Sequence, residues 1–211
     1  MKLDDFKLNR PAKISQNSKK LLTFIFFISF LMFVKLAPYG NTSLMGDTLS
    51  KQIFILYFFI VNQTLGIVHE GGHGICYILG CPEFITALNG TVFQLLFPFL
   101  VGFYYKKRGQ FFVYLIGLFF LGISLYYTAW YISTAGEGLY LPASKSFLGV
   151  DGLHDFNFIL SKMHLLSYHK FIAGFVRFIA MIVMIYSVGY MFYLAFFASK
   201  KSIKERDEIK R

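Results

Sequence analysis

Several apolar runs in this 211-residue chain are long enough to cross a lipid bilayer, and they limit the possible folds more than any other feature. A crossing takes about 20 residues of helix. Hydrophobic side chains make up 56% of the sequence and charged ones only 15%. A water-soluble domain of this size could not bury so much apolar surface, so the sequence predicts an all-α, polytopic helical membrane protein.

Turn residues and charges divide the chain into about five membrane segments. Pro38 and Gly40 end the first apolar run, and Gly80 and Pro82 end the second, because these residues break helices. The predicted segments cover residues 21–37, 52–79, 90–105, 111–133 and 171–198. We expect a single membrane domain over 21–198, a basic cytoplasmic tail over 1–20, a short extended piece over 82–89 and a basic tail over 199–211.

The net charge of +10 indicates a membrane surface as the partner, not nucleic acid, because the basic residues flank the apolar runs. Anionic lipid headgroups account for such a distribution. The flanking residues are Lys2, Lys7, Arg10, Lys13, Lys19 and Lys20 before the first run, Lys106, Lys107 and Arg108 in the middle, and Lys200, Lys201, Lys204, Arg206, Lys210 and Arg211 after the last run.

The positions of these charges leave two topologies open. If all five segments cross, the basic clusters lie on opposite sides of the membrane, against the positive-inside tendency. If residues 83–105 form a re-entrant hairpin, all basic clusters are cytoplasmic and four segments cross. The second topology would separate residues 69–73 from the segment 134–170, which must approach each other for the chemistry described below. We therefore favour five crossings.

The strongest motif of the chain is His69-Glu70-Gly71-Gly72-His73 within the second apolar run. Residues four apart lie on one face of a helix, so His69 and His73 can bind one metal ion. Glu70 can take a proton from a metal-bound water and pass it to a leaving amine. Two packing histidines and a buried glutamate are the simple alternative. Ionisable groups inside a membrane segment are costly and usually functional, which favours a metal site, with Zn²⁺ as the ion.

A catalytic zinc takes three protein ligands, so the third must come from elsewhere in the chain. Residues 134–170 hold the candidates Asp151, His154 and Asp155. Asp155 is favoured because it begins a short amphipathic stretch over residues 156–166, although it could also be the N-cap of that stretch. Asp151 before Gly152 could be a turn residue. His154 is a candidate ligand, oxyanion stabiliser or partner of a ligand.

Two further groups are weaker candidates. Gln94 lies four residues after Gly90 on the same helix face and could donate a hydrogen bond to an oxyanion or bridge two helices. Cys76 and Cys81 are close in sequence, and we expect them to be packing residues without a structural disulfide.

The motif 69–73 inside an apolar helix, the segment 90–98 after it and the aspartates at 151–155 resemble the site-2 protease group of intramembrane zinc metalloproteases. In that group the third zinc ligand is an aspartate in a Leu-Asp-Gly type motif, which resembles Val150-Asp151-Gly152 here. The pair His154-Asp155 resembles a variant in small, divergent members. The resemblance implies a zinc endopeptidase that cuts a peptide bond of a membrane protein or peptide in or near the bilayer.

Three other functions compete with this prediction. A metal transporter would need ionisable groups along several spans, which are nearly free of them. A desaturase-type oxidase has several histidine boxes that bind iron, whereas this chain has one such box and only five histidines. An inactive protease homologue that binds membrane partners would not need Glu70. The short architecture favours a bacterial cell membrane as the location, and the sequence does not indicate an oligomeric state.

Overall fold

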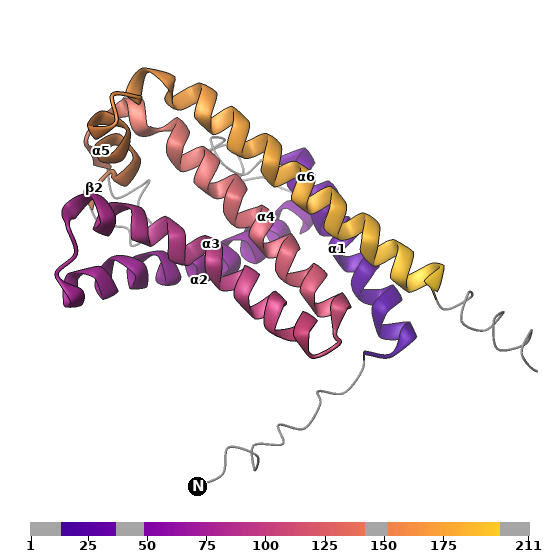
Figure 1. Ribbon diagram of the computed structural model, residues 1–211. Coiled ribbons are helices and arrows are strands. Elements are labelled where there is room, and N and C mark those ends of the chain that lie inside the picture. The colour runs from indigo at the N-terminus through magenta and orange to yellow at the C-terminus, as the bar shows by residue number, and fades with distance from the viewer. Residues whose placement is uncertain (1–13, 37–48, 142–151, 199–211) are drawn as a thin grey trace, which may run out of the picture.

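The structure, a computed structural model, describes residues 14–36, 49–141 and 152–198 and is built almost entirely of helices (Figure 1). The long helices are α1 (Gln16–Leu36), α2 (Leu49–Leu79), α3 (Glu83–Lys107), α4 (Phe111–Ser133) and α6 (His169–Phe196). Between α4 and α6 lie a 3-10 turn (Ala135–Glu137), β1 (Tyr140–Leu141), β2 (Gly152–Leu153), the short helix α5 (Asp155–Lys162) and a second 3-10 turn (Leu166–Tyr168). The predicted all-α membrane fold is confirmed.

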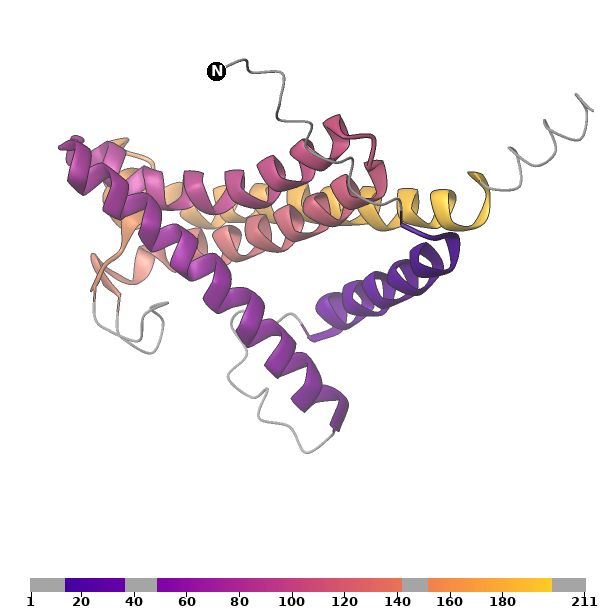
Figure 2. The ribbon, with the colours of Figure 1, turned by 90° about the horizontal axis from the view of Figure 1, so that it is seen from below.

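Within the described residues, four helical stretches are long and apolar enough to cross a membrane. They are Gln16–Val34, Glu83–Lys107, Phe111–Glu137 and Leu166–Phe196, which correspond to α1, α3, α4 and α6. The chain is therefore a multi-pass membrane protein, as predicted. The fifth predicted segment is α2, a 31-residue helix that runs obliquely across the others (Figure 2).

Helix α3 contains the segment predicted over residues 90–105, but it differs from the predicted extended piece and from the hairpin alternative. It is one continuous helix of 25 residues that begins at Glu83 and passes through Pro98, so residues 83–105 form no hairpin and residues 82–89 are not extended. Proline has no N–H to bond the carbonyl four residues earlier, which here belongs to Gln94. The Ser124 hydroxyl of α4 donates to that Gln94 carbonyl at 3.3 Å. A side chain of the neighbouring helix thus replaces the missing bond, as membrane helices require.

The long helices form a row in which α2 packs on α3, α3 on α4, α4 on α6, and α6 on α1. Buried hydroxyls bridge neighbouring helices, and Ser187 of α6 donates to the carbonyl of Leu115 in α4 at 2.6 Å. The start of α1 reaches the end of α6, where the Gln16 side chain donates to the Leu194 carbonyl at 3.2 Å. Helix α1 therefore runs antiparallel to α6.

The row brings to one end of the molecule the points where the three basic segments of the sequence join the helices. The starts of α1 and α4 and the ends of α3 and α6 meet there. For example, the ring centroids of Phe111 in α4 and Tyr190 in α6 lie 5.2 Å apart. The ends of α2 and α4, the starts of α3 and α6, and α5 lie at the opposite end (Figure 1). From the sequence, placing all basic clusters on one side of the membrane implied a separation of residues 69–73 from the segment 134–170. In the structure this separation does not arise, because residues 69–73 and α5 share the end that is far from the basic segments.

The expectation that Cys76 and Cys81 are only packing residues is wrong, because they form a disulfide with 5.0 Å between their Cα atoms. The cause is the turn that ends α2. Gly80 adopts a left-handed φ of 67°, the Cys81 N–H bonds the Cys76 carbonyl at 2.9 Å and the Gly80 N–H bonds the Tyr77 carbonyl at 3.4 Å. This is a Schellman motif, which places two side chains in contact at the positions of Cys76 and Cys81.

Candidate metal centre

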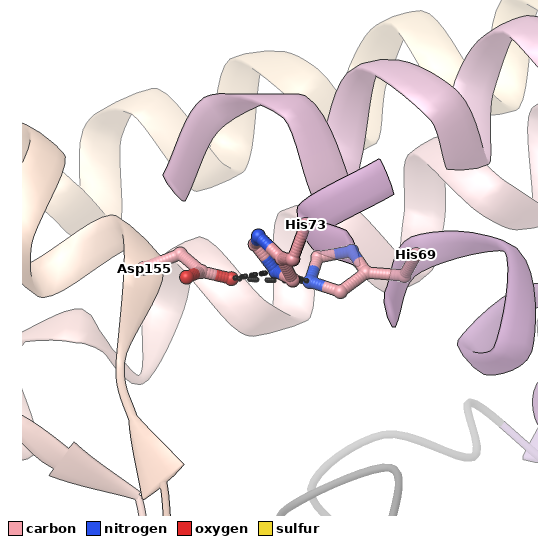
Figure 3. Close-up of side chains that lie close together, drawn as sticks. All are labelled: His69, His73 and Asp155. Carbon is pink, nitrogen blue, oxygen red and sulfur yellow. Dashed lines mark hydrogen bonds and ion pairs between the residues drawn. The ribbon is translucent and has the colours of Figure 1, made fainter. Parts of the chain in front are cut away.

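Three side chains from distant parts of the chain meet at one point (Figure 3). His69 and His73 come from the second half of α2, and Asp155 is the first residue of α5. The Nε2 atom of His69 lies 3.0 Å from Asp155 Oδ2 and 3.1 Å from His73 Nε2, and His73 Nε2 lies 3.3 Å from Asp155 Oδ2. These three residues form a group that could hold a metal ion.

The size of this triangle fits a zinc ion. Ligand atoms at about 2.0–2.1 Å from a tetrahedral zinc lie roughly 3.3 Å from one another. Two of the observed edges, at 3.0 and 3.1 Å, are slightly shorter than that distance, and the third, at 3.3 Å, matches it. Two imidazole nitrogens and one carboxylate oxygen are also a donor set that zinc accepts. Three protein ligands leave one tetrahedral position for water or substrate.

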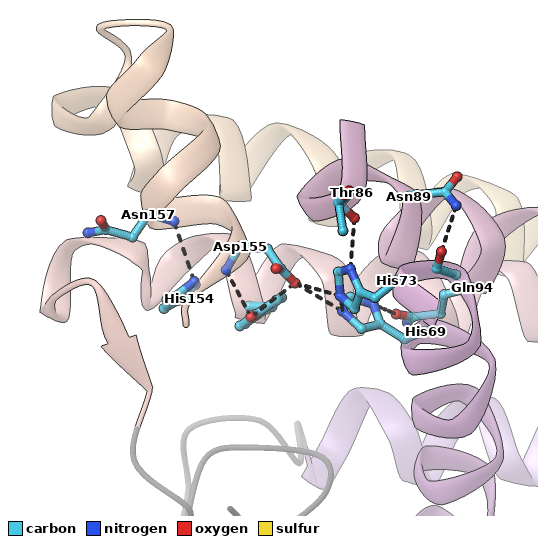
Figure 4. Close-up of polar contacts among 10 residues, drawn as sticks. His69, His73, Thr86, Asn89, Gln94, His154, Asp155 and Asn157 are labelled. Atoms are coloured by element: carbon cyan, nitrogen blue, oxygen red, sulfur yellow. Dashed lines mark hydrogen bonds and ion pairs between the residues drawn. The ribbon is translucent and has the colours of Figure 1, made fainter. Parts of the chain in front are cut away.

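The other nitrogen of each imidazole is held by an oxygen that accepts a hydrogen bond (Figure 4). His73 Nδ1 donates to the Thr86 carbonyl at 2.7 Å, and His69 Nδ1 lies 3.1 Å from the Gln94 side-chain oxygen. A carbonyl cannot donate, so Nδ1 carries the proton and the neutral ring presents a lone pair at Nε2. Two lone pairs and a carboxylate then face one another, and such a group needs a cation, either a metal ion or a proton.

The α3 backbone packs directly against the two imidazole rings and closes one side of the centre. This close approach is possible because Gly90 has no side chain. A Cβ at Gly90 would lie 2.5 Å from His73 Nε2 and 2.8 Å from His69 Nε2. At Gly72 a Cβ would lie 2.5 Å from the Asn89 carbonyl oxygen, so this glycine allows α3 to pack against α2. Asn89 secures the contact by donating from its amide to the Gly72 carbonyl at 2.7 Å.

Asp155 is held in place by its own helix and by α4. Its backbone N–H donates to the Tyr131 hydroxyl at 3.2 Å, and that hydroxyl donates to Asp155 Oδ2 at 3.3 Å. Burial by itself would raise the pKa of the Asp155 carboxyl. When a proton supplies the cation, the Nε2 atoms of His69 and His73 share it with the carboxylate, and their hydrogen bonds and charge outweigh burial and lower that pKa below its ordinary value. Asp155 therefore stays ionised, as a metal ligand must.

His154 lies outside this group of ligands, and its ring fixes the start of α5 instead. It is the N-cap of α5, so the alternative in which Asp155 is the N-cap is wrong. The Asn157 N–H donates to His154 Nδ1 at 3.4 Å, and His154 Nε2 lies 3.0 Å from the Thr134 hydroxyl. The ring stacks on Tyr131 with 4.4 Å between centroids. Of the three predicted roles, these contacts favour that of a partner which positions a ligand.

The other two predicted catalytic residues lie beside the centre. Glu70 follows His69 on α2, is half-buried, and interacts electrostatically with His73 and with Tyr127 and Tyr131 of α4. Gln94 is 1% exposed and contacts His69 through its side-chain oxygen. Gln94 is therefore placed to orient a ligand, and its role as a donor to an oxyanion stays a prediction.

Compared with protein-family models, curated proteins and solved structures, the chain has no match. The resemblance to the site-2 protease group rests on the residues of the motifs, and any function must be argued from the geometry of the centre.

Sequence reasoning missed several residues that support the centre, namely Thr86, Asn89, Tyr131 and Thr134. Thr86 acts through its backbone carbonyl, which no sequence motif encodes. Tyr131 is one of 14 tyrosines, and nothing in the sequence distinguishes it from the others. Asp151, the alternative ligand, lies outside the described residues. His164 is exposed and does not belong to the group of ligands.

Proposed function

We propose that the chain is a zinc-dependent endopeptidase that hydrolyses a peptide bond in or near the membrane. The observation that carries the proposal is the convergence of His69, His73 and Asp155 with Glu70 beside them. When bound, a zinc ion would supply Lewis-acid activation of a water molecule and of the scissile carbonyl. His69, His73 and Asp155 would hold that ion.

Glu70 is the general base of the proposed reaction. Its carboxylate takes one proton from the attacking water, whose oxygen forms a bond to the carbonyl carbon of the substrate. The carbon–nitrogen bond then breaks, and Glu70 returns the proton to the leaving amine. The products are one carboxylate and one amine, and Glu70 is restored. Support for this role comes from the position of Glu70 next to the first ligand and from the electrostatic effect of its charge on His73.

A substrate backbone must also reach the ligands, and the side chains of His73 and Asp155 each keep 13% of their surface exposed. A helical substrate must unwind locally before its peptide bond reaches the centre, because helical hydrogen bonds shield the bond. Substrates with helix-breaking residues near the cut should therefore be preferred.

A metal transporter fits the structure less well. Within the described residues, His69, His73 and Asp155 are the one group of three or more His, Cys, Asp or Glu side chains close enough to hold a metal ion. Transport across a bilayer needs further polar sites along a path.

Metal content and cleavage test the proposal together. Wild-type protein purified in detergent without chelators should hold about one zinc per chain. His69→Ala, His73→Ala and Asp155→Ala should lose it, whereas His164→Asn should keep it because His164 lies outside the group. Wild type without zinc, or ligand variants that all retain it, would refute the metal centre.

The catalytic step is tested with single-span test proteins that carry an epitope tag at each end and are co-expressed with the chain. Glu70→Gln should keep its zinc and lose cleavage. Glu83→Gln is the matched control, because Glu83 is exposed at the start of α3 and does not belong to the group of ligands. If Glu70→Gln cleaves the test proteins as fast as wild type, Glu70 is not the base.

A further inference from the structure

The two ends of the helix row differ strongly in charge. Fifteen of the 21 lysines and arginines precede α1, lie within its first turns, join α3 to α4, or follow α6, and all of these segments begin at one end of the row. Five of the 11 acidic residues belong to the same segments. We call this end the basic end. The segments that join it account for the whole net charge of +10, because the remaining charges of the sequence balance.

The basic end also has the structure of a membrane interface. The Lys106 ammonium lies 4.7 Å from the centre of the Tyr114 ring, the Lys107 ammonium 5.0 Å from that of Phe103, and the Arg108 guanidinium 4.4 Å from that of Tyr104. Aromatic rings and basic side chains together are typical of the headgroup level of a bilayer. Basic residues near this level favour the cytoplasmic leaflet, which is rich in anionic lipid.

The opposite end holds the metal centre. Asp155 begins α5 there, and the ends of α2 and α4 supply His73 and Tyr131. The end of α4 also meets the start of α6, since a Cβ at Gly136 would lie 2.6 Å from the His169 ring. We call this end the metal end.

From these two observations we infer that the basic end is cytoplasmic and that the metal centre faces the extracytoplasmic side. Helices α1 and α4 then cross outward, and α3 and α6 cross inward, so that the four candidate spans alternate in direction. Helix α2 connects the far end of α1 to the start of α3 on the extracytoplasmic side.

The disulfide supports this orientation independently of charge. Cys76 and Cys81 are paired at the metal end, three and eight residues after His73 in the sequence. Disulfides persist in the periplasm and outside the cell, whereas the cytosol keeps thiols reduced. Both the charges and the disulfide place the metal end on the same side of the membrane.

The orientation limits the class of substrate, a step that rests on the proposed endopeptidase function. The scissile bond must reach the centre from the extracytoplasmic half of the bilayer. Substrates are therefore membrane proteins or peptides whose cut site lies at or just outside that leaflet, and the cytoplasmic loops of membrane proteins are excluded.

Cysteine labelling in sealed cells tests the orientation. The chain has two cysteines, so Cys76→Ser together with Cys81→Ser gives a background without thiols. Into it we would introduce Tyr140→Cys at the metal end or Asn17→Cys at the basic end, since both side chains are exposed. The chain is expressed in a bacterial inner membrane, and intact spheroplasts are treated with a membrane-impermeant maleimide.

We expect Tyr140→Cys to be labelled in sealed spheroplasts and Asn17→Cys only after the membrane is permeabilised. The reverse pattern, or equal labelling of both variants without permeabilisation, would overturn the orientation. Wild-type protein provides a second measurement that does not depend on the cysteine-free background. Its two thiols should resist a permeant maleimide until an impermeant phosphine is added to the sealed cells, and thiols that react without reduction would overturn the oxidising location.

These measurements need neither metal nor catalysis. A chain with the inferred orientation and no cleavage would refute the endopeptidase alone. A chain that cleaves its substrates but fails the labelling would refute the orientation alone.

Discussion

Gly90→Ala should strongly weaken metal binding, because the added methyl group would occupy the space of the ligands. The Cβ would lie 2.5 Å from His73 Nε2, 2.7 Å from His73 Cε1 and 2.8 Å from His69 Nε2. Non-bonded heavy atoms prefer about 3.5 Å or more, so the rings or the α3 backbone must move by roughly 1 Å. Metal–ligand distances tolerate only about 0.2 Å of change.

Removing a residue that hydrogen-bonds to a metal ligand typically lowers metal affinity by about 10–100-fold, and we expect Gly90→Ala to lower zinc affinity by at least this factor. This factor corresponds to roughly 1.4–2.8 kcal/mol of binding free energy. Helix propensity acts in the opposite direction, because alanine stabilises a helix by about 1 kcal/mol relative to glycine. A weaker metal site in Gly90→Ala therefore cannot come from a less stable α3.

Affinity is measured by competition with a chromophoric zinc chelator in detergent. Gly71→Ala is the matched control, because it makes the same glycine-to-alanine change at a position where none of the described residues places an atom within 4 Å of the new Cβ. It should keep wild-type affinity. Equal affinities for wild type and Gly90→Ala would refute the position of α3 against the two imidazole rings.

Three further predictions concern the residues around the centre. Gln94→Leu removes the acceptor of His69 Nδ1 and should lower zinc affinity by about 10–100-fold. Gln94→Glu keeps an acceptor and should bind zinc nearly as wild type. The chelator competition assay measures both affinities, and equal affinities of the two variants would refute this role of Gln94. Tyr131→Phe keeps the ring that stacks on His154 but loses the hydroxyl bonded to Asp155. Thermal unfolding should show that the free energy of unfolding falls by about 1 kcal/mol. An unchanged stability would mean that the hydroxyl does not hold Asp155. Cys76→Ser with Cys81→Ser removes the cross-link of a short loop and should lower stability by about 2 kcal/mol under oxidising conditions. As a control, wild type treated with reductant should unfold at the same temperature as the double variant.

Much of the centre follows from the sequence because its two histidines obey a local rule. Residues four apart on a helix share a face, so His69 and His73 could be paired without knowing the fold. Asp155 was favoured as the third ligand because it begins a helix, and the structure places it in the group. The preference for Asp155 over Asp151 depended on local helix signals alone.

Other features depend on contacts between distant segments, which no local pattern specifies. The hairpin alternative over residues 83–105 came from the distribution of basic residues, and the structure has one continuous helix there instead, in which Ser124 of α4 bonds the carbonyl that Pro98 cannot reach. The disulfide was a different kind of error, because its signal is local. Gly80 between Cys76 and Cys81 has the spacing of a Schellman motif, and that motif brings the two cysteines together.

The metal centre joins residues that are 86 positions apart in the sequence, which couples metal concentration to folding. Ligands so far apart do not come together in an unfolded chain, so a zinc ion held by this centre would bind the folded form almost exclusively. By mass action, free zinc at 100 times its dissociation constant adds about 2.7 kcal/mol to the stability of the folded form. The unfolding temperature of the wild-type protein should therefore rise with the logarithm of the free zinc concentration, while that of Asp155→Ala stays constant.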